Sequence, residues 1–145
     1  MISWMITERR HQTMGPVVLD SFALVSLFHR EPGWEKVRDV LRDLDAKGDK
    51  VRLCLINWGE FYYVLKRRVG RRKAEEALLL LAQLPVEVEP VDQGLVKEAA
   101  EIKADYPVSY ADAFCIATAL RSDAYVMTSD PEFKAVQHLL TIAWL

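Results

Sequence analysis

Short apolar runs alternate with longer amphipathic segments along this chain, and that alternation is what most restricts its fold. The short runs read as strands, and the longer segments repeat apolar residues at helical spacing. Strands that alternate with helices predict a mainly parallel sheet covered by helices on both faces. We therefore predict an α/β fold, a three-layer α/β/α sandwich with four to five strands. The expected strands are 17–19, 51–56, 86–91 and 124–128, with 140–144 either a fifth strand or a tail.

Glycine and proline divide the intervening segments into helices. Gly70 leaves room only for a tight turn, so the helices on either side of it should form an antiparallel hairpin. Val86 and Val88 alternate with glutamates, and this polar face predicts a strand near the edge of the sheet. The expected helices are 21–29, 34–46, 57–69, 71–84, 93–106, 109–122 and 131–138.

Length and composition indicate one globular domain. The chain has 145 residues, of which 51% are hydrophobic, enough to build a core. Residues 1–15 look like an N-terminal arm and 16–145 like the domain. The arm lacks the pattern of a signal peptide, and no apolar run is long enough to span a bilayer. We expect a cytoplasmic protein that does not bind membranes. The two separate cysteines, Cys54 and Cys115, fit a reducing compartment.

Four acidic residues stand where apolar runs end or helices begin: Asp20, Glu60, Asp112 and Asp130. In an open parallel sheet, ligands collect beyond the carboxyl ends of the strands. Helix capping is the alternative for each acid taken alone. Asp20 and Asp130 precede helices, and the pairs Asn57/Glu60 and Ser109/Asp112 match the capping box.

Capping does not explain why all four acids should gather at one end of the sheet. Carboxylates in close array repel one another, and a divalent cation with oxygen ligands relieves that repulsion. Mg²⁺ is the expected ion, with Mn²⁺ as a second choice. The hydroxyls of Ser21, Thr128 and Ser129 lie at the same rim and are candidate supporting groups, with capping the alternative for Ser129.

Four segments in this order resemble the PIN-domain family, and within it the VapC-type toxins of toxin–antitoxin pairs. The segments are VVLDSFALVSLF, INWGEFYYVLKRR, SYADAFCIATAL and VMTSDPEF. The resemblance covers the chain from about Val17 onward, and the N-terminal arm departs from it. It implies an α/β/α sandwich and a Mg²⁺-dependent ribonuclease. The family's four acids then correspond to Asp20, Glu60, Asp112 and Asp130.

The resemblance thus implies metal-assisted hydrolysis of RNA phosphodiester bonds by the toxin of a VapBC-type pair. Asp20, Glu60 and Asp112 would hold the metal, and Asp130 would complete the site. Two other functions stay open: a receiver-like phosphoacceptor signalling module, and a PIN-like scaffold that binds RNA without cutting it. A receiver would usually carry adjacent acids after its first strand, whereas here only Asp20 stands there.

A dense basic cluster lies at the turn of the predicted helical hairpin and is a candidate for contacting RNA phosphates. A net charge of −2 argues against a broad phosphate-binding surface, so any such contact must be local. A solvated turn is the alternative. Tyr62 and Tyr63 could stack on bases, although core packing is the stronger expectation. The cluster consists of Lys66, Arg67, Arg68, Arg71, Arg72 and Lys73.

Apolar residues on the predicted helices exceed what one buried stripe needs. Trp34, Phe61, Leu65 and the run 78–81 are the surplus, for which a partner surface and core packing are both explanations. In VapC-type toxins a partner surface implies a homodimer contact and a groove for the cognate antitoxin.

Overall fold

Five parallel strands form one sheet in a computed structural model that describes residues 15–145. The strand order is β3-β2-β1-β4-β5, and every neighbouring pair is parallel. This confirms the predicted α/β class and makes 142–144 a strand rather than a tail. The strands are β1 (Val17–Leu19), β2 (Val51–Cys54), β3 (Val86–Glu89), β4 (Tyr125–Thr128) and β5 (Ile142–Trp144). The predicted arm lies outside the described residues, except for Gly15.

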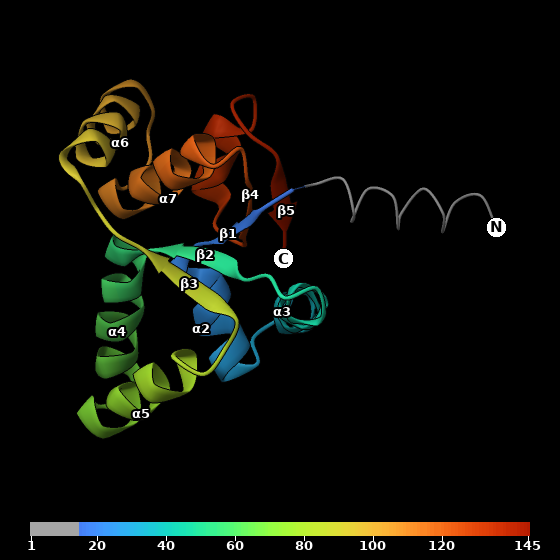
Figure 1. Cartoon of the computed structure of the whole chain (residues 1–145). Coiled ribbons are helices and arrows are strands. Elements are labelled where there is room, and N and C mark those ends of the chain that lie inside the picture. Colours follow the sequence, from blue (N-terminus) through green and yellow to red (C-terminus); the bar gives the residue numbers. More distant parts are fainter. Residues whose placement is uncertain (1–14) are drawn as a thin grey trace.

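Helices cover both faces of the sheet (Figure 1). α6 (Gln93–Asp105) and α7 (Tyr110–Arg121) lie on one side, and α2 (Ser21–His29), α3 (Trp34–Ala46) and α5 (Arg71–Leu81) on the other. α4 (Leu55–Val69) starts at the sheet and runs away from it toward α5, and the two helices form the predicted hairpin. A short 3₁₀ helix, η1 (Pro131–Val136), follows β4.

Each face of the sheet has its own hydrophobic core, because successive strand residues point to opposite sides. In β1, Val17 and Leu19 belong to the core under α2–α5, while Val18 belongs to the core under α6 and α7. All three are buried, as expected for a central parallel strand covered on both sides. β3 is half exposed and stands at an edge of the sheet, which confirms the prediction from its alternating glutamates.

The junction between β2 and α4 differs from the prediction. β2 ends at Cys54 instead of residue 56, and α4 begins directly at Leu55. Leu55 and Ile56 extend the apolar run and so look like strand residues, but both are exposed on the first turn of α4. The early helix start changes the position of Asn57 and Glu60 on α4, which matters for the site below.

Within residues 15–145, no helix is both long and apolar enough to cross a bilayer.

Candidate active site

The strand order reverses between β1 and β4, and we refer to the region beyond the carboxyl ends of these two strands as the crevice. The chain adds β2 and β3 on one side of β1 and then returns to add β4 and β5 on the other side. Open α/β sheets bind ligands where the order reverses in this way. The receiver-like alternative requires the order 2-1-3-4-5, which this sheet does not have. Asp20 follows β1 at the point of reversal, and its side chain is 0% exposed.

Two hydrogen bonds fix the carboxylate of Asp20. Its Oδ1 accepts from the backbone N of Ala23 at 2.8 Å, so the residue caps α2 as its position predicted. Its Oδ2 accepts from Thr128 Oγ1 at 2.5 Å. Thr128 Oγ1 in turn accepts from the backbone N of Asp130 at 2.9 Å. Thr128, the last residue of β4, therefore connects the first acid to the fourth.

Glu60 reaches the crevice from α4. The hydroxyl of Ser21, the residue after Asp20, donates to Glu60 Oε1. Ser21 is buried and Glu60 half-buried, so this contact lies at the boundary between the crevice and solvent. Because Ser21 directly follows Asp20 in the sequence, this bond holds Glu60 close to Asp20.

Asp112 lies on the first turn of α7 with 2% of its surface exposed. Ser109 caps this helix, and its Oγ accepts from the backbone N of Asp112 at 3.1 Å. The reciprocal bond of a capping box, in which the Ser109 N–H would donate to the Asp112 carboxylate, does not form. Instead Asp112 Oδ2 is buried without a hydrogen-bond partner. Capping therefore accounts for Ser109 and leaves the carboxylate of Asp112 unexplained.

Asn57 is not a helix cap, and the predicted capping box with Glu60 is wrong. Cys54 is the N-cap of α4, and no side chain caps that helix. Asn57 is fully buried on the first turn, where its Nδ2 donates to the carbonyl of Ala111 at 3.0 Å. This bond ties the start of α4 to the start of α7 and so sets Glu60 relative to Asp112.

Glu132 joins the site, although the sequence analysis did not predict it. Carboxylate oxygens of Asp112, Asp130 and Glu132 lie within 4.8 Å of one another. Asp130 caps η1 by accepting from the backbone N of Glu132 at 2.9 Å, which brings the Glu132 side chain to the same place. Asp20 stands beside this compact group of three and is linked to Asp130 through Thr128, while Glu60 accepts from Ser21, the residue after Asp20.

Burial and mutual repulsion shift the proton equilibria of the two most buried acids. Burial raises the pKa of Asp20 to about 7, against hydrogen bonds from Thr128 and Ala23 that lower it, and the charges of Asp130 and Glu60 add to the rise. Burial is also the main reason that the pKa of Asp112 lies well above its usual value. The neighbouring carboxyls of Glu132 and Asp130 raise this pKa further. These neighbours can hydrogen-bond to Asp112 only if one of the carboxyls holds a proton.

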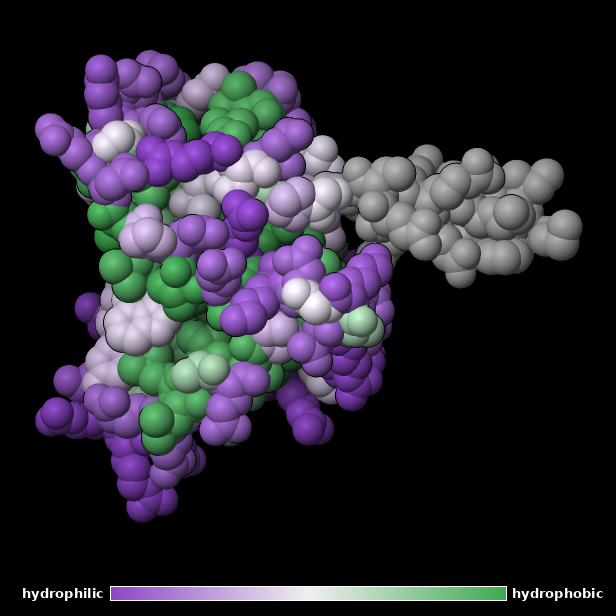
Figure 2. Space-filling model, in the orientation of Figure 1, coloured by the Kyte–Doolittle hydropathy of each residue, from purple (hydrophilic) through white to green (hydrophobic). Residues whose placement is uncertain are grey.

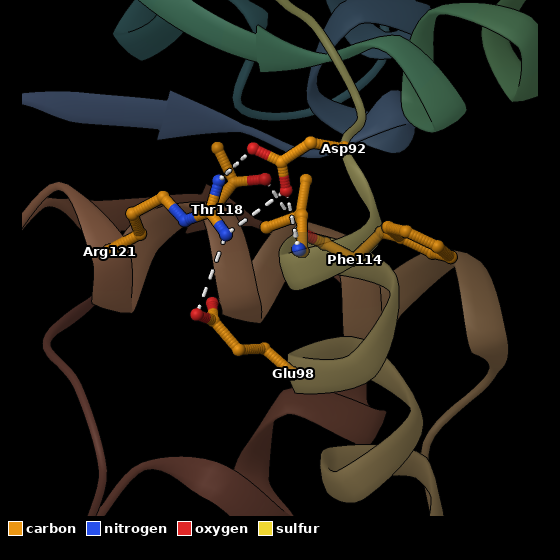
Figure 3. A network of polar contacts seen from close by, with 6 residues as sticks. Asp92, Glu98, Phe114, Thr118 and Arg121 are labelled. Atoms are coloured by element: carbon orange, nitrogen blue, oxygen red, sulfur yellow. Dashed lines mark hydrogen bonds and ion pairs between the residues drawn. The ribbon is translucent and has the colours of Figure 1, made fainter.

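No cation balances this negative charge within residues 15–145, because every ion pair described there lies elsewhere. Arg121, at the far end of α7 from Asp112, pairs with Asp92 at 3.1 Å and with Glu98 at 3.4 Å (Figure 3). That network fastens α7 to the start of α6. The acids of the crevice are therefore left to repel one another.

The predicted basic cluster projects at the turn between α4 and α5, away from the sheet (Figures 1 and 2). All six of its side chains are exposed. Arg68 pairs with Glu31 at 2.9 Å, and Arg72 with Glu76 at 3.5 Å, so two members are partly neutralised. Ser129 is exposed, and Asp130 rather than Ser129 caps η1.

Replacing Thr128 by valine should destabilise the protein by about 2 kcal/mol. The change leaves Asp20 Oδ2 and the Asp130 N–H without their partner, and an orphaned buried polar group costs about 1–3 kcal/mol. Urea denaturation at pH 8 measures the loss. Thr118→Val is the matched control, because this equally buried hydroxyl donates at 2.8 Å to the Phe114 carbonyl, which α7 already satisfies (Figure 3). Equal losses in the two variants would contradict the expectation.

The parallel sheet with its acidic crevice defines a class of α/β protein with a candidate metal site at the strand ends. The chain belongs to the PIN domain family, whose sequence model matches residues 17–139. Its fold is similar to DNA-bound VapBC from Salmonella typhimurium, with a TM-score of 0.70 and 16% identity over 90% of this chain and 98% of that chain. It is also similar to VapC20 of Mycobacterium tuberculosis, a toxin that cleaves the Sarcin–Ricin loop. That match has a TM-score of 0.68 and 22% identity over 83% of this chain and 94% of that chain.

This chain is also similar in sequence to part of a longer curated protein. It is a dimethylsulfoniopropionate lyase from Durusdinium sp. clade D, 30% identical over 109 residues. The match covers 72% of this chain but 35% of the lyase. The chain thus spans about a third of the length of that relative.

Proposed function

We propose that this protein is a metal-dependent ribonuclease that hydrolyses RNA phosphodiester bonds. The observation that carries the proposal is the convergence of five carboxylates on the crevice between β1 and β4 without a balancing cation. They are Asp20, Glu60, Asp112, Asp130 and Glu132. Asp20 and Asp112 are the buried members of this group, and helix capping does not account for Asp112, whose Oδ2 is buried without a hydrogen-bond partner.

The donor set fits a hard divalent cation. All of its ligand atoms are oxygens, the preference of Mg²⁺ and Mn²⁺, and the raised pKa values show that the acids need a positive charge to stay ionised together. Asp20, Glu60, Asp112 and Asp130 are the proposed holders, with Glu132 as an additional one. When bound, the ion supplies an activated water and neutralises charge that develops on the phosphate.

The residues around the acids have orienting roles in this proposal. Thr128 and the Ala23 N–H fix both oxygens of Asp20, and Ser21 fixes one oxygen of Glu60. Asn57 holds the helix of Asp112 against the helix of Glu60. A site with preset ligands spends little free energy on reorganisation during the reaction. The exposed hydroxyl of Ser129 remains a supporting candidate for positioning water.

RNA as substrate and a toxin–antitoxin role rest on family membership and on the similar folds. The structural matches cover 98% of the VapBC chain and 94% of the VapC20 chain, so this chain contains nearly the whole fold of each. The non-catalytic scaffold is the second candidate, and the intact set of acids weighs against it. A cytoplasmic location and a homodimer accompany the proposal as predictions.

An apolar groove offers a place for a cognate antitoxin segment. It has a volume of about 560 Å³ and lies between α2, α3 and the end of α5. Figure 2 shows hydrophobic side chains gathered in this lower part of the molecule, edged by hydrophilic ones. Leu80 is exposed there and Leu79 is exposed beside it on α5, whereas Phe61 and Leu65 are buried, so core packing is the explanation that holds for those two. The apolar lining consists of Leu27, Phe28, Leu41, Leu80, Leu84 and Pro85.

Removing divalent metal should abolish cleavage of RNA. Purified protein is incubated with single-stranded RNA in Mg²⁺, in excess EDTA, and in EDTA followed by excess Mg²⁺. We expect cleavage in the first and third mixtures only, with fragment yield in EDTA lowered at least about a hundredfold, because the acids alone cannot activate water. Cleavage at the same rate in EDTA would refute the metal-dependent mechanism, and no cleavage in any mixture would favour the scaffold.

A further inference from the structure

Tyr63 occupies an unusual place at the mouth of the crevice. It lies on α4 one turn after Glu60, and its hydroxyl is 3.5 Å from Glu60 Oε2, yet 45% of its surface is exposed. Burial and then the charge of Glu60 raise the pKa of Tyr63, and Asp112 adds to the rise. The phenol therefore points toward the acids while part of the side chain faces solvent.

The neighbouring Tyr62 serves a different purpose. It packs against the core under α2–α5, and its hydroxyl donates to Glu75 on α5 at 2.8 Å. Tyr62 thus holds the α4–α5 hairpin together, as core packing predicts. Tyr63 has no such partner on α5, so the structure separates two adjacent tyrosines that the sequence treats alike.

Arg67 covers one face of the Tyr63 ring. Its guanidinium carbon is 5.0 Å from the ring centroid, and the side chain joins no ion pair among the described residues. Through Tyr63, whose hydroxyl lies beside Glu60, Arg67 is the member of the basic cluster that is connected to the acids. The pair therefore presents a flat ring next to a free positive charge, close to where a phosphate would react.

Other helices that begin at this edge of the sheet also expose aromatic residues close to their acids. Phe22 stands two residues after Asp20 on α2 and is 36% exposed, and Tyr110 stands two residues before Asp112 on α7 and is 46% exposed. Hydrophobic rings next to charged, buried acids are not needed for the core. Their exposure at one end of the sheet indicates a surface for flat, apolar ligand groups.

We propose that Tyr63, backed by Arg67, stacks on an unpaired nucleobase beside the phosphate to be cleaved. This inference deepens the proposed function and rests on it, because it takes RNA as the substrate. The acids repel a phosphate backbone, so part of the affinity must come from an uncharged part of the ligand. Nucleobases provide it by stacking on aromatic rings, and only unpaired bases can reach the ring. Arg67 then lies where it can meet a neighbouring phosphate.

Fluorescence anisotropy with a labelled single-stranded RNA of about ten nucleotides tests the role of the ring. Binding is measured in Mg²⁺ in an Asp112→Asn background, so that cleavage does not interfere. Tyr63→Leu should weaken binding about tenfold, which corresponds to about 1.4 kcal/mol. Tyr63→Phe keeps the ring and should bind within about twofold of the parent. Tyr62→Leu is the matched control and should also leave affinity unchanged.

Abasic substitutions in the RNA locate the stacked base. One position should cost the parent about tenfold in affinity and cost the Tyr63→Leu protein little, since both changes remove the same contact. A fully paired duplex should bind with no dependence on Tyr63. Unchanged affinity in Tyr63→Leu, an equal loss in Tyr63→Phe, or no binding by the parent would each overturn the inference. Failure of the proposed function is seen separately, as absence of metal-dependent cleavage by the unmutated protein.

Discussion

Asp112→Asn is expected to lower RNA cleavage by about a hundred- to a thousandfold while the protein remains folded. Asp112 is the buried acid whose Oδ2 has no hydrogen-bond partner, so its charge is free to serve a ligand. Asparagine keeps the size and shape of the side chain but removes the charge. Losing one preorganised charged group from an active site typically costs on the order of 10²–10³ in rate. Initial cleavage rates at saturating Mg²⁺ measure the effect.

The same substitution should not destabilise the fold, and this separates a functional acid from a structural one. Asparagine can donate from its amide to the nearby carboxylates of Asp130 and Glu132, which the aspartate repels. The melting temperature in EDTA should therefore stay equal or rise. Asp105→Asn on α6, an exposed position, is the matched control and should retain full activity. Loss of activity together with loss of folding would assign Asp112 a structural role instead.

The architecture could be predicted from the sequence because the pattern of each element is local. β-Branched runs such as 17–19 are recognisable as strands, and their order along the chain restricts the topology to few choices. The end of β2 could not be found in this way. Leu55 and Ile56 prolong an apolar run, and their exposure on α4 depends on how the helix leaves the sheet, which no local pattern reveals. That error produced the wrong capping role for Asn57.

The candidate site was foreseeable where topology alone positions a residue. Asp20 and Asp130 follow strands, so their meeting at the strand ends required only a parallel sheet. Glu132 was missed because an acid next to a proline at a helix start fits ordinary capping. Its approach to Asp112 depends on the 3₁₀ turn of η1. A second acid two residues after Asp130 was the one available signal.

Distinguishing core from surface on α4 was beyond the sequence for a similar reason. Phe61, Tyr62 and Tyr63 are consecutive, and helical periodicity assigns them to different faces without saying which face meets a partner element. The positions of α2 and α5 against α4 decide it, so Phe61 is buried, Tyr62 half-buried and Tyr63 exposed. The basic cluster illustrates the opposite case, because charge alone predicted its exposure.

The stability of the metal-free protein should fall as pH rises from 5 to 8, and Asp20 should account for much of the fall. Its pKa is about 7 in the folded state, whereas an unperturbed aspartate in the unfolded chain has a pKa of 3.8. Below pH 4 both states hold the proton and the shift has no effect. Between pH 4 and 7 the unfolded chain releases the proton while the folded protein keeps it. Stability therefore decreases by about 1.4 kcal/mol per pH unit at most and levels off above pH 7.

Comparison of the unmutated protein with Asp20→Asn isolates this contribution from other titrating groups. The free energy of unfolding is measured by urea denaturation in EDTA at pH 5, 6, 7 and 8. For the unmutated protein it should decrease as the pH rises. Relative to the variant, it should lose roughly 2–3 kcal/mol between pH 5 and 8. Asparagine has no proton to lose, so the variant should show the smaller slope. Parallel curves for the two proteins would mean that Asp20 does not titrate in this range.

Addition of Mg²⁺ should reverse the loss, because a cation favours the ionised acids. At pH 8, Mg²⁺ at ten times its dissociation constant should raise the unfolding free energy by about 1.4 kcal/mol through mass action. At pH 5 the gain should be much smaller, since the ion must then compete with the proton on Asp20. Asp20→Asn should show little gain at either pH, whereas Asp105→Asn should respond like the unmutated protein. If the gain were equal at both pH values, Mg²⁺ would be binding away from Asp20. The acids at the strand ends would then not be responsible for the stabilisation by Mg²⁺.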